Sequence, residues 1–343
     1  MSSHDSRGLP GLAGIIGLAL VVGAGAIVTG LRYSSVDPGG SSDAASPTAP
    51  ANSGEQRPRP PRSATDVPAH ATEEYGRRLV AQTVELLGPD QPDPARRYSG
   101  GRLNCASCHL ATGTDPGTLA LLQTAEHYPR FSGRAGTMTD IEDRINECMQ
   151  RSMNGQILPI DSPEMMAIAA YLRSLGSRYE AMGASLKKAA EPPAFKTPKR
   201  AASVAAGQVV YGARCSVCHG NDGLGLLATG EKSKGYLFPP LWGPDSFNDG
   251  AGMHRVLTAV RFIKARMPLG EATLTDDEAF DVAAYINAQP RPHMPNIDQD
   301  YPDKAAKPVD NPYGPFADDF PLEQHRFGPF QPIEDHYKAL KKK

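Results

Sequence analysis

The sequence predicts an all-α fold of two small helical domains in tandem, preceded by an apolar stretch and a proline-rich linker. Two observations carry this expectation. The pattern C-x-x-C-H occurs at residues 105–109 and again at 215–219, and each copy opens a block of domain size. Ala-Ala-Tyr-Leu at residues 169–172 is echoed by Ala-Ala-Tyr-Ile at 283–286. The two blocks therefore resemble an internal duplication.

The N-terminal segment, residues 1–33, predicts a single membrane-spanning helix. Residues 8–31 are 24 positions without a charge, and about 20 apolar residues suffice to cross a bilayer. We see no convincing small-residue cleavage site before the following polar run, which favours an uncleaved anchor over a cleaved signal peptide. Arg7 and Arg32 balance each other and do not orient the helix.

The predicted domain plan follows from composition. Residues 34–70 are rich in proline and serine and lack the apolar residues needed for a core, so they form a linker. Domain 1 spans 71–191, a short linker 192–200, domain 2 201–291, and an irregular proline-rich tail 292–343. For the tail we weigh three readings: a segment wrapped on the domains, a docking segment for a partner, and disorder. The formal charge of −2 gives no argument for nucleic acid.

Helical periodicity and capping residues locate the elements of each domain. In domain 1 we expect helices at 72–88 and 139–152, and a third that begins at Ser162 with proline at its first position. In domain 2 we expect helices at 203–214, 253–265 and 276–288. Ile141, Ile145 and Cys148 fall on one face of the second helix, so this face should turn toward the domain's functional centre.

The two C-x-x-C-H motifs indicate covalent attachment of two haem c groups. The attachment residues are Cys105, Cys108 and His109 in domain 1 and Cys215, Cys218 and His219 in domain 2. The thiols would bond the haem vinyl groups, and each histidine would become an iron ligand. The alternative, a pair of zinc or thiol-redox sites, is disfavoured because no further zinc ligands accompany either motif. Since this attachment is completed on the exported side of a membrane, we expect the domains on the periplasmic side of the inner membrane, either anchored or, after cleavage, soluble.

The second iron ligand in domain 2 is expected to be Met267, which is followed by proline about 50 residues after the motif histidine. A thioether ligand raises the reduction potential of a haem, which suits an electron-accepting centre. Met253 and His254 are rival candidates.

Domain 1 has no such methionine, and Cys148 stands at the comparable place. An odd cysteine in an exported protein needs an explanation, and it is either a buried apolar thiol or a thiolate ligand of the first haem. We favour the ligand, because Arg144, Arg151 and Ser152 would supply positive charge and a hydrogen-bond donor beside its sulfur. The same charge would attract an anionic substrate.

The run Arg-Ile-Asn-Glu-Cys-Met-Gln-Arg-Ser-Met-Asn-Gly at residues 144–155, with Tyr-Pro-Arg-Phe-Ser-Gly-Arg at 128–134, resembles the dihaem thiosulfate dehydrogenases that form tetrathionate. The resemblance covers about residues 71–291 and implies two class I cytochrome c-like domains. It also implies that Cys148 ligates the haem opposite His109 and that Arg134, Arg144 and Ser152 bind the sulfur anion. Electrons would then pass through the second haem to a small cytochrome c or a membrane oxidase.

One position departs from the family pattern. Some members carry a lysine directly before the distal methionine and exchange the two ligands on redox change, whereas this chain has Arg266, which stays protonated and does not ligate iron. The expected activity is the oxidation of two thiosulfate ions to tetrathionate. A membrane-tethered dihaem relay without its own substrate chemistry is the alternative. A cytochrome of a sulfur-oxidising carrier complex is a third reading, weakened by the lack of a recognisable partner signature.

Overall fold

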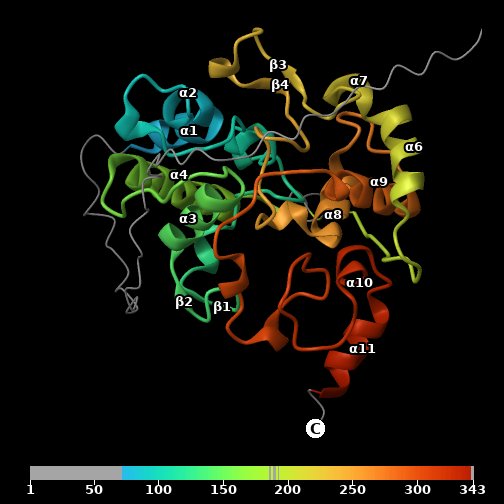
Figure 1. Ribbon diagram of the computed structural model, residues 1–343. Helices are drawn as coiled ribbons and strands as arrows, with labels where there is room; N and C mark the ends of the chain where they lie inside the picture. The colour runs from blue at the N-terminus through green and yellow to red at the C-terminus, as the bar shows by residue number, and fades with distance from the viewer. Residues whose placement is uncertain (1–71, 185–186, 188–190, 192, 341–343) are drawn as a thin grey trace, which may run out of the picture. The chain divides into compact units, whose positions relative to one another are not determined.

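A computed structural model describes residues 72–184, 187, 191 and 193–340 and is mostly helical, in agreement with the sequence (Figure 1). The predicted N-terminal anchor and the linker after it lie outside the described residues. None of the helices that the structure describes between residues 72 and 340 combines the length and the apolar character needed to cross a membrane.

The described residues of domain 1 form four α-helices and a small hairpin. Its helices are α1 (Glu73–Ala81), α2 (Thr83–Leu87), α3 (Ile141–Arg151) and α4 (Pro163–Glu180), and strands β1 (Arg130–Ser132) and β2 (Thr137–Thr139) pair antiparallel. Helix α4 starts as expected, with Ser162 accepting a hydrogen bond from the N–H of Met165 and proline at the first position.

The single helix expected at 72–88 is interrupted at Gln82, whose backbone is at φ −127°, ψ 38°. The segment that leads into the first motif explains the break. The hydroxyl of Thr83 accepts a hydrogen bond from the N–H of Cys105 at 3.0 Å, and the side chain of Asn104 accepts one from Val84 N at 2.9 Å. The first contact uses the side chain of Thr83 and the second the backbone N–H of Val84, so the start of α2 is joined to the motif segment instead of continuing α1.

Domain 2 repeats this plan, and the segment after it is more regular than expected. The domain contains α6 (Val204–Arg214), α7 (Ser216–His219), α8 (Val256–Arg266), α9 (Asp276–Ala288) and the paired strands β3 (Leu226–Leu227) and β4 (Tyr236–Phe238). Beyond residue 292, where no regular structure was predicted, lie α10 (Leu322–Phe327) and α11 (Gln331–Leu340). Both helices are short, and Phe327, Phe330 and Ile333 are buried, so contacts with the rest of the fold, rather than a local period, support them.

Short 3₁₀ turns connect these elements. They are Pro94–Arg96, Cys105–Ser107, Ala111–Gly113, Ala125–His127, Lys232–Lys234, Gly252–His254, Ile297–Gln299 and Lys304–Ala306.

The two hairpins correct the expectation of a purely helical fold. Their strands have two or three residues, too few to show a period of two, and Phe131 and Met138 on the first hairpin are exposed.

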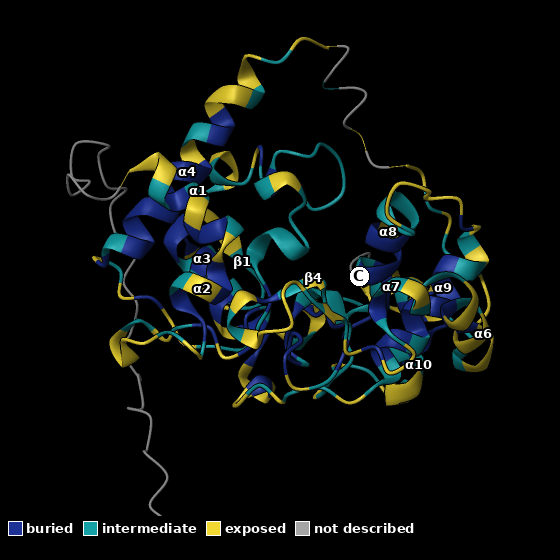
Figure 2. Cartoon of the chain, turned by 90° about the horizontal axis from the view of Figure 1, so that it is seen from above, coloured by how far each residue is buried: buried dark blue, intermediate teal, exposed yellow. Residues whose placement is uncertain are grey.

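A glycine lies at the closest helix crossing of each domain. A Cβ atom at Gly76 of α1 would stand 2.0 Å from the carbonyl oxygen of Ala167 in α4, and one at Gly207 of α6 would stand 1.9 Å from that of Asp281 in α9. The same added Cβ would stand 2.8 Å from the Cβ of the tyrosine in the repeated Ala-Ala-Tyr sequence, Tyr171 or Tyr285. Buried residues gather where these helices meet (Figure 2). The internal duplication is therefore a repeated helix crossing.

We expect Gly207→Ala to lower the free energy of unfolding by at least about 2 kcal/mol, because the added methyl group forces α6 and α9 apart. Denaturant unfolding followed by circular dichroism measures this change. Gly212→Ala in the same helix is the control, since no atom lies within 4 Å of its Cβ position; it should be neutral or slightly stabilising. Equal destabilisation by both variants would contradict the crossing as the cause.

Candidate functional site

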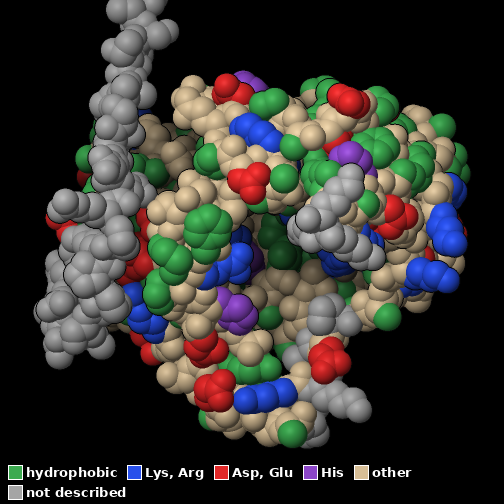
Figure 3. Space-filling view, turned by 90° about the horizontal axis from the view of Figure 1, so that it is seen from below, with side chains coloured by type: hydrophobic (Ala, Val, Ile, Leu, Met, Phe, Trp, Pro, Cys, Tyr) green, Lys and Arg blue, Asp and Glu red, His purple; other side chains and the backbone are tan. Residues whose placement is uncertain are grey.

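A single cavity of about 520 Å³ gathers the predicted site residues of domain 1. Its wall includes the motif residues Cys105, Cys108 and His109 together with Arg134, Arg144, Cys148 and Ser152. Three parts of the chain contribute to it: domain 1, domain 2 and the segment after residue 292. In the space-filling view, a hollow bordered by Lys or Arg side chains opens on one face (Figure 3).

His109 is oriented by a backbone contact. Its Nδ1 lies 2.6 Å from the carbonyl oxygen of Leu119. Because a carbonyl only accepts, Nδ1 carries the proton and Nε2 keeps its lone pair, as in a metal-ligating histidine with an oriented ring. Burial lowers the pKa of His109, which favours the neutral ring.

Helix α3 carries Cys148 to the cavity wall. Asp140 and Asp143 cap its start reciprocally, each side chain accepting the other's N–H at 3.0 Å. Ile141 and Ile145 are buried in the core of domain 1. Cys148 follows on the same face and lies where the core borders the cavity. Of the face expected to turn toward the functional centre, Cys148 lines the cavity and the two isoleucines pack in the core beside it.

Arg144 lies one turn before Cys148 and lines the same cavity. The charge that the nearby Cys148 sulfur carries in its thiolate form is the main cause that raises the pKa of Arg144 above its usual value, and Glu147 adds to it. The Glu147 carboxylate accepts a hydrogen bond from Nη1 of Arg144 at 3.0 Å. A permanent positive charge therefore stands beside the sulfur.

Arg134 comes from the turn between β1 and β2. Its side chain is 16% exposed, with Nη1 3.9 Å from Glu147 and Nε 3.8 Å from Asp300. Its guanidinium carbon lies 5.8 Å from the centre of the Tyr301 ring. Within the described part of the chain the buried Nε has no hydrogen-bond partner. Arg134 thus brings a charge with uncommitted donors to the cavity, which suits an anion.

Ser152 and Arg151 end α3 and differ in role. Ser152 lines the cavity, and no residue that the structure describes forms a hydrogen bond with its hydroxyl. Arg151, expected to supply charge near Cys148, is instead buried and donates two hydrogen bonds to the carboxylate of Asp300, at 2.7 and 2.8 Å. Its charge is paired, because Asp300 arrives from a segment 149 residues further along.

Comparison with known proteins gives the family. The family model "SoxA/TsdA, cytochrome c domain" matches residues 98–181, and "Cytochrome C oxidase, cbb3-type, subunit III" matches 202–286. A thiosulfate dehydrogenase of Stutzerimonas stutzeri is 38% identical over 71% of this chain and 76% of its own length. One of Allochromatium vinosum is 39% identical over 63% and 77%. The chain belongs to the thiosulfate dehydrogenase family.

A solved structure agrees with this membership. The thiosulfate dehydrogenase (TsdBA) from Marichromatium purpuratum, in its as-isolated form, is 34% identical and superposes with a TM-score of 0.56. The match covers 69% of this chain and half of that one. Two cytochrome c domains in tandem, the predicted arrangement, are thus confirmed.

The second site of this family member is built around His219. Its Nδ1 lies 2.8 Å from the carbonyl oxygen of Pro239, so Nε2 is again the free ring nitrogen. Met267 directly follows α8 and packs, half-buried, against the core of domain 2, as Cys215 also does. The two motif histidines are therefore oriented in the same way, each through Nδ1 by a backbone carbonyl.

The two rivals of Met267 differ in their contacts. His254 has Nδ1 2.8 Å from the carbonyl oxygen of Asp249 and Nε2 3.2 Å from that of Asn287, so both nitrogens face backbone groups. Met253 lines the cavity of domain 1 and also packs, half-buried, against the core of domain 2. The contacts of His254 therefore disfavour it as an iron ligand, and Met267 stays the predicted ligand with Met253 as its rival.

Arg266, which stands where some family members have lysine, is bound to domain 1. Its guanidinium forms an ion pair with Asp115 at 3.0 Å and donates a hydrogen bond to the carbonyl of Pro116. The side chain is thus committed to the loop that follows the first motif.

Sequence reasoning missed the residues that close the first cavity from outside domain 1. They include Phe247, Met253 and Arg255 from domain 2 and Tyr301 and Pro308 from the C-terminal segment. No local pattern marks them, because their role depends on distant contacts.

The residues at both motifs fit haem c. Each motif histidine has one ring nitrogen held by a backbone carbonyl and the other free. The first cavity also has an apolar part, to which Leu103, Met153 and Phe247 contribute. Imidazole and sulfur donors in such a setting are the usual ligands of haem iron.

The free energy of unfolding should decrease as the pH is lowered from 6.5 to 4, in part because of His254. Burial lowers the pKa of this residue to about 4, so over this interval the unfolded chain binds a proton that the folded one does not. His254→Gln should therefore reduce the loss of melting temperature on acidification. The exposed His127→Gln is the control and should follow the wild-type profile. If the His254 variant also follows it, the lowered pKa is refuted.

Proposed function

We propose that this protein joins two thiosulfate ions into tetrathionate and passes the two electrons to an acceptor. The observation that carries the proposal is the shared cavity of Cys148, Arg134, Arg144 and Ser152 beside the first motif. The names of the relatives, thiosulfate dehydrogenases, support it.

In the reaction, the terminal sulfur atoms of two thiosulfate dianions form one S–S bond. Each ion gives up one electron, no proton moves, and the product is one tetrathionate dianion. The main obstacle is repulsion between two like-charged reactants. Groups that hold positive charge where the two anions meet lower this barrier.

The residues of the cavity have distinct roles in the proposal. Arg134 and Arg144 offset the charge of the anions, and the hydroxyl of Ser152 donates to a substrate oxygen. Cys148 is the proposed iron ligand opposite His109, and its sulfur lies where a substrate sulfur can approach. A haem bound covalently here supplies the first electron acceptor. The same residues serve the reverse reaction, reduction of tetrathionate.

Electrons leave through the second site, where we propose a second covalently attached haem with His219 and Met267 as ligands. The final acceptor is a small cytochrome c or a membrane oxidase. We further propose that residues 1–33 anchor the protein at the periplasmic side of the inner membrane, which keeps the site near such acceptors.

Steady-state reduction of an artificial acceptor by thiosulfate tests the activity, with Cys148→Gly compared with wild type. We expect turnover by wild type and a loss of at least about 100-fold in the variant, since the sulfur beside the reacting centre is gone. Haem content of both proteins is the control. Wild type that exchanges electrons normally but turns over neither thiosulfate nor tetrathionate would support the relay instead.

Met267→His should lower the reduction potential of one haem, because an imidazole donates more electron density to iron than a thioether does. A spectroscopic redox titration measures this. Met253→Leu is the matched control and should leave that potential unchanged. If Met253→Leu shifts the potential and Met267→His does not, the ligand assignment is wrong.

A further inference from the structure

Two acidic residues of the C-terminal segment each pair with an arginine of the first cavity. Five arginines line it: Arg130, Arg134, Arg144, Arg151 and Arg255. Asp300 binds Arg151 through two hydrogen bonds of 2.7 and 2.8 Å, and the fully buried Asp310 accepts from Nε of Arg255 at 2.9 Å. The segment thus holds two cavity arginines by hydrogen bonds, whereas Arg134 lies 3.8 Å from Asp300 and forms no hydrogen bond with it.

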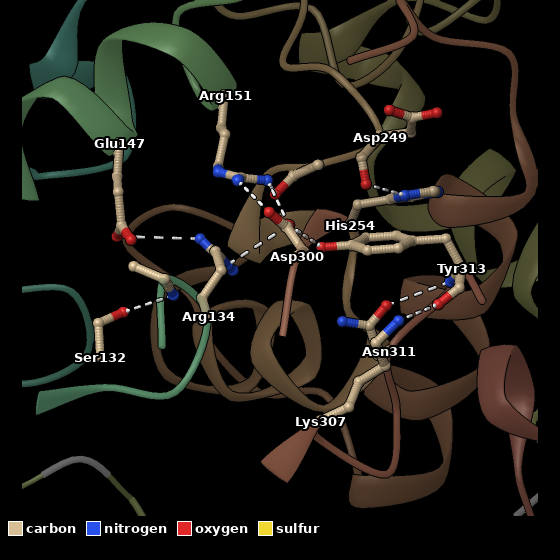
Figure 4. A network of polar contacts seen from close by, with 12 residues as sticks. Ser132, Arg134, Glu147, Arg151, Asp249, His254, Asp300, Lys307, Asn311 and Tyr313 are labelled. Carbon is tan, nitrogen blue, oxygen red and sulfur yellow. Dashed lines mark hydrogen bonds and ion pairs between the residues drawn. The ribbon is translucent and has the colours of Figure 1, made fainter. Parts of the chain in front are cut away.

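Asp300 also belongs to a network that surrounds Arg134 (Figure 4). The hydroxyl of Tyr313 donates a hydrogen bond at 2.7 Å to Oδ2 of Asp300, which also accepts from Arg151. Tyr301, the next residue, donates its N–H to the carbonyl oxygen of Arg134 at 2.8 Å, and its ring lies against the guanidinium. The Lys307 ammonium joins this network by donating a hydrogen bond to the backbone carbonyl of Tyr313 at 3.1 Å. Arg134 is therefore held through its backbone and beside its side chain.

The distance between Asp300 and Arg134 is informative. At 3.8 Å, Oδ2 of Asp300 is beyond hydrogen-bond range of Nε, which has no partner within the described residues. It is still close enough to attract the guanidinium. The carboxylate of Asp300 accepts its hydrogen bonds from Arg151 and Tyr313. It therefore orients Arg134 without consuming the donors that an anion needs.

We propose that Asp300 is a positioning residue of the anion site. It fixes Arg151 in the wall and directs Arg134 toward the cavity, which makes the C-terminal segment part of the functional site. This inference rests on the proposed function, because it assigns Asp300 a part in binding thiosulfate.

Asp300→Asn tests the proposal, since it removes the charge and keeps the size. We expect the KM for thiosulfate to rise about tenfold, with a smaller change in kcat, because Arg134 and Arg151 lose their orientation. Tyr313→Phe should raise KM in the same direction by less. A residue that acted only as a local negative charge would give the opposite sign, since its removal tightens anion binding. A lowered or unchanged KM in Asp300→Asn therefore overturns the proposal.

Asp318→Asn is the matched control. Asp318 is another buried carboxylate of the same segment, which accepts hydrogen bonds from Tyr337 and from Phe320 N and contacts His325 at 3.0 Å. Neither aspartate lines the cavity, but Asp300 contacts two arginines that do, whereas these contacts of Asp318 include none of them. The variant should lose stability and keep the wild-type KM. An equal rise in KM with Asp318→Asn would assign the effect to general destabilisation and overturn the proposal.

Calorimetric titration of the haem-loaded proteins with thiosulfate separates this inference from the proposed function. If wild type does not turn over thiosulfate, the proposed function fails. The affinity of the two proteins for thiosulfate still tests whether Asp300 positions the anion site. Binding about tenfold weaker in Asp300→Asn than in wild type supports the positioning role. Equal binding by both, or no binding by wild type, refutes it.

Discussion

The buried ion pair of Arg151 and Asp300 is the contact on which the arrangement of the site depends. Arg151 ends the helix that carries Cys148, and its side chain also donates to the carbonyl of Gly250 in domain 2 at 3.3 Å. Its own carbonyl accepts a hydrogen bond from Asn248 at 3.1 Å. A buried pair adds little net stability over apolar residues, whereas removal of one partner costs about 3–5 kcal/mol. The pair therefore fixes the relative position of three segments.

The sequence predicts well those features that local rules decide. Helix α9 has the predicted bounds, because Thr275 and Glu278 form a capping box at its start. The capped start of α3 and the apolar period after it bring Cys148 to the expected wall. Arg134, Arg144 and Ser152 lie in the same cavity, as the resemblance implied. Each of these predictions rests on residues a few positions apart or on one continuous motif.

Features that distant contacts decide do not follow from the sequence. Nothing near Asp300 indicates that it pairs with a residue 149 positions earlier. Arg151 has the same charge as Arg144 and lies near Cys148 in sequence, so sequence alone gives both the same role. Likewise Met253, a rival candidate for the second haem by its position in the sequence, packs against the core of domain 2 and also lines the first cavity. Charge pairing and contacts between the domains distinguish residues that look equivalent in the amino-acid sequence.

Arg266 illustrates how a family position acquires a different use. A guanidinium presents several donors in a planar fork, and here it reaches the carboxylate of Asp115 and the carbonyl of Pro116 together. Asp115 and Pro116 lie between His109 and Leu119, whose carbonyl orients that histidine. Met267 is the next residue after Arg266. The same side chain therefore links the proposed distal ligand of the second haem to the loop that orients the proximal ligand of the first. Arg266 therefore joins domain 2 to domain 1, through an ion pair and a hydrogen bond, directly beside Met267.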